Sequence, residues 1–324
     1  MAQRLSTLPK FLTNPRSLRI IGAKSSAGGP RPGPEAAPDS LVRFGLLNNL
    51  RDLHYDVDYN ECLPKDTSAH AVPQTYPLGL NNAHAISSFT HSLSEQVYNH
   101  ARQGSMVLTL GGDRSIAIGS ITGAAKATRE RLNGLEMAVI YVDAHADINT
   151  PETSGSGNVH GMPVTFATGV AKRCSTGLFD WIQREHLVNV DRLVYIGLRD
   201  VDDEEWRIIR ERGIKAFDMR AARENGIQKI MDMTLDYIGD DTPIHVSFDI
   251  DSLDPTVAPS TVFPVDGKLS LEEGMEIARR VRETGSLVAM DLVEVNPSVE
   301  RERLDLTMRS GVSVVESALG NFAQ

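Results

Sequence analysis

The sequence contains few cysteines and lacks any long apolar stretch. Only Cys62 and Cys174 occur, and they lie far apart and outside any Cys-x-x-Cys pair. This argues against a disulfide framework and against a thiolate metal site. No apolar run reaches the roughly 20 residues that a helix needs to cross a bilayer. These absences predict a protein of a reducing compartment, the cytoplasm, without a membrane partner.

Positive charge is also in short supply. The chain has 33 Lys and Arg residues against 43 Asp and Glu residues, which gives a net charge of −10. Proteins that bind nucleic acid usually present a basic face, so we expect no nucleic-acid partner. An acidic balance instead fits a site rich in carboxylates, which attracts a metal ion or a cationic small molecule.

The N-terminus differs from the rest of the chain in charge. Residues 1–16 contain Arg4, Lys10 and Arg16 and no acid. Such a segment is either a simple tail or a mitochondrial transit peptide, which would place the protein in that organelle. We expect residues 1–16 to form a basic N-terminal tail and residues 17–324 to form a single catalytic domain.

Short apolar runs alternate with longer helical patterns. Continuous apolar runs are typical of strands that are buried on both faces of a parallel sheet. The sequence predicts strands at Leu18–Gly22, Met106–Leu110, Met137–Asp143, Arg192–Gly197, Ile214–Phe217, Ile244–Asp249 and Leu287–Glu294. It predicts helices at Ile116–Leu132, Glu204–Glu211, Ile227–Tyr237, Leu271–Thr284 and Leu304–Leu319. This alternation favours an α/β fold with three α/β/α layers and a mainly parallel central sheet.

Three of the predicted strands end in acids. They lead into Asp143-Ala144-His145-Ala146-Asp147, Asp249-Ile250-Asp251 and Glu294. A lone Asp at a strand end is more often a turn former or a helix cap. Two such clusters are harder to explain in that way, because the carboxyl ends of parallel strands meet at one crevice. Converging carboxylates need a cation, and oxygen ligands with one imidazole suit manganese.

The same stretches resemble those of a known family. Gly111-Gly112-Asp113, DAHADINTP (143–151), SGNVHG (156–161), GLRDVD (197–202), SFDIDSLDP (247–255) and EVNPS (294–298) occur in the order and spacing found in arginases, which belong to the ureohydrolase superfamily. The resemblance covers nearly the whole chain. It implies the arginase-like fold and the hydrolysis of L-arginine to L-ornithine and urea by a metal-activated hydroxide.

The resemblance also implies roles for the acids. Asp143 and Asp249 would bridge two Mn²⁺ ions, His145 and Asp251 would complete the shell of one ion, and Asp147 would bind the other. The homo-oligomer expected by resemblance is a trimer.

Further residues would contact the substrate, a small molecule. Glu294 would anchor the guanidinium group and His160 would shuttle protons to the product amine, so that His160, Asp147 and Glu294 form the catalytic set. The remaining substrate-binding residues would be Asn149, Ser154, Ser156, Asn158, Asp202 and Glu205. Without the resemblance, residues 154–158 are equally typical of a polar loop, and residues 202–205 of an acidic first helical turn.

The chain departs from the family pattern at two important positions. Arg114 stands where arginases have a histidine that binds the first manganese ion. A guanidinium group carries only donors and cannot ligate a metal. Val262-Phe263-Pro264 replaces the family's glycine-threonine-proline, which brings bulky apolar groups toward the expected guanidinium pocket.

Three interpretations follow from Arg114. Both ions still bind, one of them weakly; or Arg114 takes the place of one ion by pairing with Asp147 or Asp143; or the chain is a non-catalytic regulatory or structural relative with impaired metal binding. Hydrolysis of another guanidino compound is a further alternative. A nucleotide-binding protein is disfavoured, because no Gly-x-Gly-x-x-Gly follows the first strand and no phosphate-binding loop motif occurs.

Overall fold

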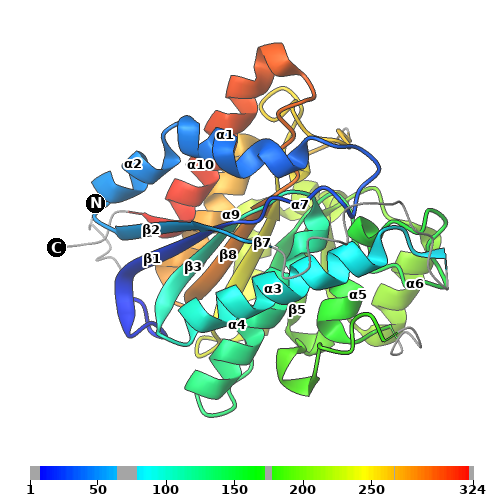
Figure 1. Cartoon of the computed structure of the whole chain (residues 1–324), viewed down its shortest axis with the longest axis horizontal. Coiled ribbons are helices and arrows are strands. Elements are labelled where there is room, and N and C mark those ends of the chain that lie inside the picture. Colours follow the sequence, from blue (N-terminus) through cyan, green and yellow to red (C-terminus); the bar gives the residue numbers. More distant parts are fainter. Residues whose placement is uncertain (1–7, 64–78, 172–176, 266, 321–324) are drawn as a thin grey trace.

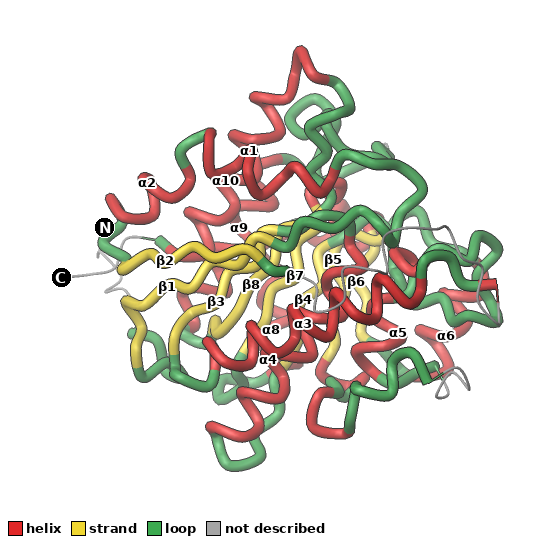
Figure 2. Tube along the Cα trace, in the orientation of Figure 1, coloured by secondary structure: helices red, strands yellow, loops and turns green. Residues whose placement is uncertain are grey.

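A computed structural model of the chain describes residues 8–63, 79–171, 177–265 and 267–320. Figure 1 shows a central sheet between two layers of helices, and Figure 2 shows the same layers by secondary structure. The expected three-layer α/β/α fold is therefore confirmed.

The sheet has eight strands in the order β2-β1-β3-β8-β7-β4-β5-β6, and all neighbouring pairs are parallel. The strands are β1 (Asn14–Gly22), β2 (Asp56–Glu61), β3 (Ser105–Leu110), β4 (Ala138–Val142), β5 (Leu193–Leu198), β6 (Lys215–Asp218), β7 (Ile244–Asp249) and β8 (Leu287–Val293). The four central strands β3, β8, β7 and β4 are buried along their whole length, which explains their continuous apolar sequences.

The helices cover both faces of the sheet. One face carries α1 (Ala37–Arg43), α2 (Leu46–Asp52), α7 (Met219–Asn225), α8 (Ile227–Ile238), α9 (Leu271–Thr284) and α10 (Leu304–Leu319). The other face carries α3 (Ala83–Ala101), α4 (Ala117–Arg131), α5 (Pro163–Thr168) and α6 (Asp203–Arg212). Alternate residues of one strand feed the two cores: Ile140 packs with the first set of helices, and Tyr141 packs with the second.

The sequence predicted the buried strands and one edge strand, β6, but missed the other edge strand. The strand β2 was missed because it is a polar edge strand with the sequence DVDYNE and no run of apolar residues. The helix α3 was also missed: its sequence AHAISSFTHSLSEQVYNHA is rich in serine and histidine, yet many of these small polar residues are buried against α4. The strand β1 begins at Asn14, inside the segment expected to be a tail.

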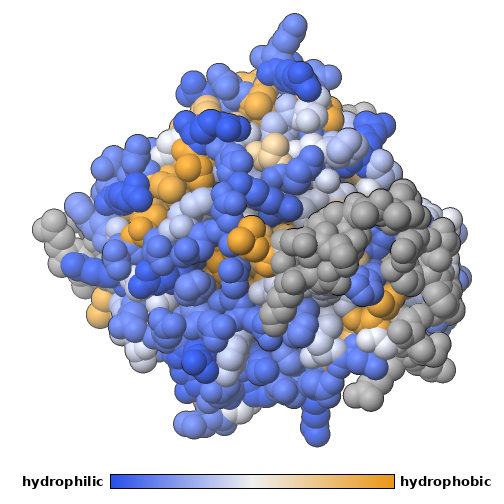
Figure 3. All heavy atoms as spheres, viewed as in Figure 1, coloured by the Kyte–Doolittle hydropathy of each residue, from blue (hydrophilic) through white to orange (hydrophobic). Residues whose placement is uncertain are grey.

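In the described part of the chain, no helix combines the length and the apolar character that crossing a bilayer requires. Figure 3 shows a mostly hydrophilic face with apolar side chains in small scattered groups.

Candidate metal centre and substrate pocket

The acids predicted from the sequence meet at the carboxyl ends of the four central strands. Asp143 follows β4, Asp249 ends β7, Glu294 follows β8, and Arg114 follows β3. Because these strands are neighbours in the order β3-β8-β7-β4, the four side chains converge from loops far apart in sequence.

Local turns orient two of the aspartates. The carboxylate of Asp143 accepts a hydrogen bond from the backbone N–H of His145 at 2.7 Å, and that of Asp249 accepts one from the N–H of Asp251 at 2.7 Å. The spacing of two residues in both motifs thus turns the strand end and presents two side chains to the same space. All four aspartates of the cluster, Asp147 included, are at most 2% exposed.

Two site acids have unusual backbone conformations. Asp147 has φ 52° and Glu294 has φ 63°, both in the left-handed region that side chains other than glycine rarely adopt. Such conformations cost on the order of 1–3 kcal/mol and are found most often at functional sites. Glu294 is held there by two backbone hydrogen bonds: its N–H donates to Gly112 O, and its carboxylate accepts from the N–H of Arg114 at 3.0 Å.

Arg114 lies in the middle of the acids and is 2% exposed. Its Nη2 donates to Asp251 at 2.6 Å and its Nη1 donates to Asp147 at 3.1 Å. Its Nε lies 3.1 Å from Asp249 Oδ2 and 3.4 Å from Glu294 Oε1, and Nη1 lies 3.6 Å from Asp143 Oδ1. One guanidinium group therefore contacts five buried carboxylates.

The remaining ligand candidates lie beside this guanidinium. Asp143, His145 and Asp251 each offer an atom to one point, since these atoms lie within 4.8 Å of one another. His145 Nδ1 is 3.3 Å from Asp143 Oδ1 and 3.2 Å from Asp251 Oδ2. His145 Nε2 lies 3.5 Å from Asp200 Oδ2, so the opposite edge of the ring faces the solvent-exposed Asp200.

The hydrogen-bond partners separate Asp147 from the other aspartates. Both oxygens of Asp147 are engaged, Oδ1 by Arg114 and Oδ2 by the hydroxyl of Tyr141 at 2.7 Å. Within the described part of the chain, one buried oxygen each of Asp143, Asp249 and Asp251 accepts no hydrogen bond. Buried carboxylate oxygens without a partner are unfavourable unless a cation binds them, so the oxygens of Asp143 and Asp251 fit a metal ion, whereas Asp249 Oδ2 already lies 3.1 Å from Arg114 Nε.

Electrostatics reflect the same arrangement. Burial raises the pKa of Asp147 to about 7, although Arg114 acts in the opposite direction. Burial would also raise the pKa of Asp251, but Arg114 and His145 outweigh it and hold that pKa below its ordinary value. The carboxylate with the shortest contact to Arg114 is therefore the most acidic of the cluster.

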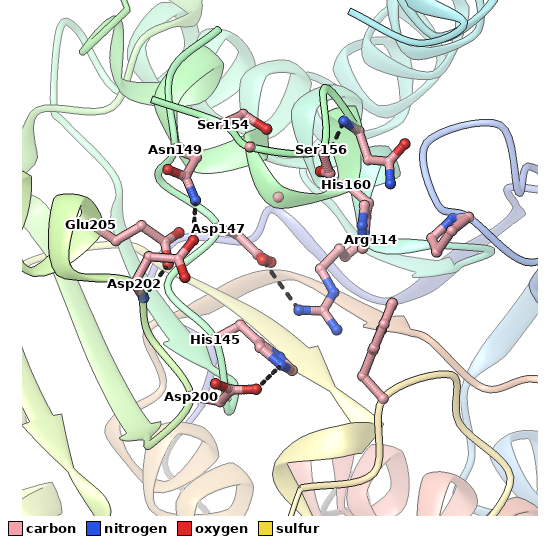
Figure 4. A pocket seen from close by; sticks show the side chains of 15 residues that line it. Arg114, His145, Asp147, Asn149, Ser154, Ser156, His160, Asp200, Asp202 and Glu205 are labelled. Carbon is pink, nitrogen blue, oxygen red and sulfur yellow. Dashed lines mark hydrogen bonds and ion pairs between the residues drawn. The ribbon is translucent and has the colours of Figure 1, made fainter. Parts of the chain in front are cut away.

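A pocket of about 430 Å³ opens above this centre (Figure 4). It is lined by Pro30, Arg114, His145, Asp147, Asn149, Ser154, Gly155, Ser156, Asn158, His160, Gly161, Asp200, Asp202, Glu205 and Phe263. Amide and hydroxyl groups from residues 149–158 line one side, and the acids Asp200, Asp202 and Glu205 line another.

The acidic side of the pocket has a local origin. Asp202 and Glu205 form a capping box at the start of α6, in which Glu205 accepts from the N–H of Asp202 at 3.1 Å. Glu205 also accepts from the N–H of Ile148 at 3.0 Å, and Asn149 donates to Asp202 at 3.1 Å. Burial raises the pKa of Glu205 to about 7. The helix cap and the pocket wall are thus the same residues.

His160 and Phe263 lie next to each other in the wall of the pocket. The two rings stack with centroids 5.5 Å apart and an interplanar angle of 21°, while Phe263 meets His145 edge-on at 6.2 Å. Burial lowers the pKa of His160 to about 3, with Arg114 and His145 acting in the same direction. The imidazole of His160 is therefore neutral at pH 7.

The structure places the predicted residues in two groups. His145, Asp147, His160 and the six residues of the predicted loop and helix turn line the pocket. The buried acids Asp143, Asp249, Asp251 and Glu294 lie behind Arg114 and are not among the lining residues. Sequence reasoning missed Asp200, although it belongs to the GLRDVD motif and adjoins the predicted Asp202. It also missed Tyr141, which looks like an ordinary strand residue until its hydroxyl is seen against Asp147.

Comparisons with known proteins agree on one family. A family model described as "Arginase family" matches residues 16–320. The chain is 52% identical over 322 residues to an arginase of Neurospora crassa, covering 96% of this chain and 88% of that protein. It is 39% identical to rabbit (Oryctolagus cuniculus) arginase-1, covering 94% of this chain and 93% of that protein.

Solved structures agree as well. The crystal structure of an Entamoeba histolytica arginase in complex with L-ornithine superposes with a TM-score of 0.84 at 27% identity, covering 95% of this chain and 99% of that one. Bacillus subtilis arginase superposes with a TM-score of 0.82 at 29% identity, covering 95% of this chain and all of that one.

Proposed function

Because this chain belongs to the arginase family, we propose that the pocket above the buried acids binds L-arginine, and that the products are L-ornithine and urea. The enzyme is an amidinohydrolase of the arginase type. The observation that carries the proposal is a pocket that opens above a buried acid cluster suited to a cation, and whose walls divide into hydrogen-bond donors and carboxylates.

The acid cluster fits a divalent metal ion. Asp143, His145 and Asp251 would hold it, and Asp249 would be a further carboxylate beside it, shared with Arg114. Oxygen ligands with a single imidazole suit Mn²⁺ better than a soft ion, and the family resemblance implies Mn²⁺ too. When bound, the ion would lower the pKa of a water molecule and so supply a nucleophile near neutral pH.

The walls of the pocket match the two ends of an amino acid. The side chains of Asn149, Ser154, Ser156 and Asn158 supply donors for the α-carboxylate, while Asp202 and Glu205, joined by Asp200, supply acceptors for the α-ammonium group. This division orients the side chain of the substrate toward His145 and Asp147, where the reaction takes place.

His160 stands at the reacting end of the pocket as a neutral imidazole. In that state it accepts a hydrogen bond rather than supplying a proton of its own. It would receive a proton from the reacting water and pass it to the leaving amine, the shuttle role that the resemblance implies. Glu294, which is bonded to the N–H of Arg114, would stabilise cationic charge at the base of the site. A homo-oligomer, with the trimer as the expected form, and a cytoplasmic location complete the proposal.

The decisive assay measures urea and ornithine together. The protein is incubated with Mn²⁺ and then with L-arginine, or with agmatine, which lacks the α-carboxylate. We expect urea from L-arginine and a rate for agmatine lower by about 10²-fold or more, because the donors of residues 149–158 lose their partner. Asp143→Asn should abolish turnover, whereas Asp203→Asn, at an exposed acid of α6, should retain it.

Other outcomes lead to the alternatives. Metal bound without urea from any guanidino compound would favour a non-catalytic regulatory or structural role, for which Arg114 is the motivating observation. Urea from a different guanidino compound would favour a substrate reshaped by Phe263, which packs against His160.

A further inference from the structure

We propose that the guanidinium group of Arg114 permanently fills one cation position of this site, so that each chain binds one divalent ion, and that Asp147 binds Arg114 rather than metal. This proposal deepens the proposed function, because the remaining ion would be the hydrolytic one. Three geometric features support it: the fit of Arg114 among the acids, the anchoring of Arg114, and the carboxylate oxygens that accept no hydrogen bond.

The guanidinium group of Arg114 fits among the acids as a bound cation would. Arg114 directs its three nitrogens to three different aspartates: Nη1 to Asp147, Nη2 to Asp251 and Nε toward Asp249. The group carries a full positive charge and has no lone pair to offer a metal. It therefore compensates the charge of these carboxylates without binding an ion itself, and it occupies the space between Asp147 and Asp249.

Arg114 has little freedom to leave this position. Its N–H is bound to Glu294, and Asp113 caps the 3-10 turn at residues 114–116 by accepting from the N–H of Ser115. The preceding Gly112 is wedged so tightly that an added Cβ would lie 1.7 Å from Ser25 O. Both backbone and side chain of Arg114 are thus fixed by packing.

The carboxylate oxygens that accept no hydrogen bond do not belong to Asp147. Asp147 has none, because Tyr141 and Arg114 take both of its oxygens. Among the described residues, Asp143 Oδ2, Asp249 Oδ2 and Asp251 Oδ1 accept no hydrogen bond, although Asp249 Oδ2 lies 3.1 Å from Arg114 Nε. The other oxygens of Asp143 and Asp251 flank His145, whose Nδ1 lies 3.3 Å from Asp143 Oδ1 and 3.2 Å from Asp251 Oδ2. Asp143, His145 and Asp251 each offer one ligand atom within 4.8 Å of the others, which suits a single ion, so the two-ion expectation drawn from the resemblance reduces to one ion in this chain.

Metal content and spectroscopy test the proposal together. The protein is stripped with a chelator, titrated with Mn²⁺, and measured for bound metal per chain and for its electron paramagnetic resonance spectrum. We expect saturation at one ion with the six-line signal of an isolated Mn²⁺. Arg114→His should bind two ions and show the broadened spectrum of a coupled pair. Arg210→Met, which removes one positive charge from the surface helix α6, should behave like the unchanged protein.

Several results would overturn the proposal. Two ions with a coupled spectrum in the unchanged protein would mean that Arg114 swings out of the centre, and no bound ion at all would mean that it displaces both. Should Arg114→His fail to fold, the stoichiometry and spectrum of the unchanged protein still decide. Urea release is scored separately: one ion without urea would refute the proposed function only, whereas two ions with urea would refute the inference only.

Discussion

Replacing Arg114 by methionine should destabilise the metal-free protein strongly. Methionine keeps much of the length and apolar volume of the side chain but removes the charge and all of its hydrogen bonds. Asp147 and Asp251 then each lose a charge-assisted hydrogen bond, at 3.1 and 2.6 Å respectively. Such bonds contribute about 1.5–3 kcal/mol each, and breaking a buried ion pair costs about 3–5 kcal/mol. Because Arg114 is 2% exposed, solvent screening does not reduce this estimate.

The loss should depend on pH in a defined direction. Without Arg114 the buried carboxyl groups would have higher pKa values in the folded state than in the unfolded chain. Groups of this kind bind more protons when folded, so stability falls as pH rises above their unfolded pKa of about 4. We therefore expect a loss of about 3–5 kcal/mol at pH 8 and a smaller loss at pH 5, where protonation relieves the repulsion.

The assay is chemical denaturation in the presence of a chelator, followed by circular dichroism at both pH values. Arg210→Met serves as the matched control, since it removes the same charge from an exposed position. A loss below about 1 kcal/mol at pH 8 would refute the reasoning, because it would mean that Arg114 does not compensate the acid cluster.

Three further predictions concern the pocket. Phe263→Thr removes the ring that stacks on His160, so the pKa of His160 should rise from about 3 toward its ordinary value as water enters. NMR titration of the imidazole measures this pKa, and an unchanged value would contradict burial by Phe263 as the cause. Asn158→Ala removes a donor from the pocket wall, so KM for L-arginine should rise about tenfold while KM for agmatine changes little; equal effects on both would show that Asn158 does not face the α-carboxylate. The pKa of Glu205 is raised to about 7 from 4.5, which predicts a contribution to stability that is present below pH 4.5 and is lost as pH rises toward 7, by about 3 kcal/mol. Glu205→Gln should flatten this decline in the free energy of unfolding measured by denaturation. An equally steep decline in Glu205→Gln would assign it to other groups.

The sequence predicted that these acids meet at one edge of the sheet, because their positions follow local rules. The motif at 143–147 and the one at 249–251 come directly after buried strands, and a parallel sheet brings such ends together without any further information. The interior strands were visible for the same reason. The edge strand β2 was missed because it is polar, and the helix α3 was missed because serine and histidine residues separate its apolar positions, although several of the serines are buried against α4.

Non-local contacts set the limit of the sequence-based prediction. That Arg114 breaks the metal-ligand pattern was evident from the sequence, but three interpretations stayed open. The contacts that distinguish between them depend on three loops and a strand at once: Arg114 meets Asp147 and Asp251 across the sheet, and Tyr141 of β4 donates to the other oxygen of Asp147. No spacing along the chain encodes which oxygen remains open.

The buried guanidinium also bears on how much of this protein a cell accumulates. Where only a metal ion compensates the charge of buried acids, the yield of folded protein depends on the supply of that metal, because the acids repel one another in the metal-free chain. Here the cation is the side chain of Arg114, which is part of the polypeptide. Every chain therefore carries it from synthesis, and the cell does not have to take it up as it does a metal ion. Scarcity of the metal should therefore lower the specific activity of the protein while leaving its abundance and its resistance to proteolysis nearly unchanged.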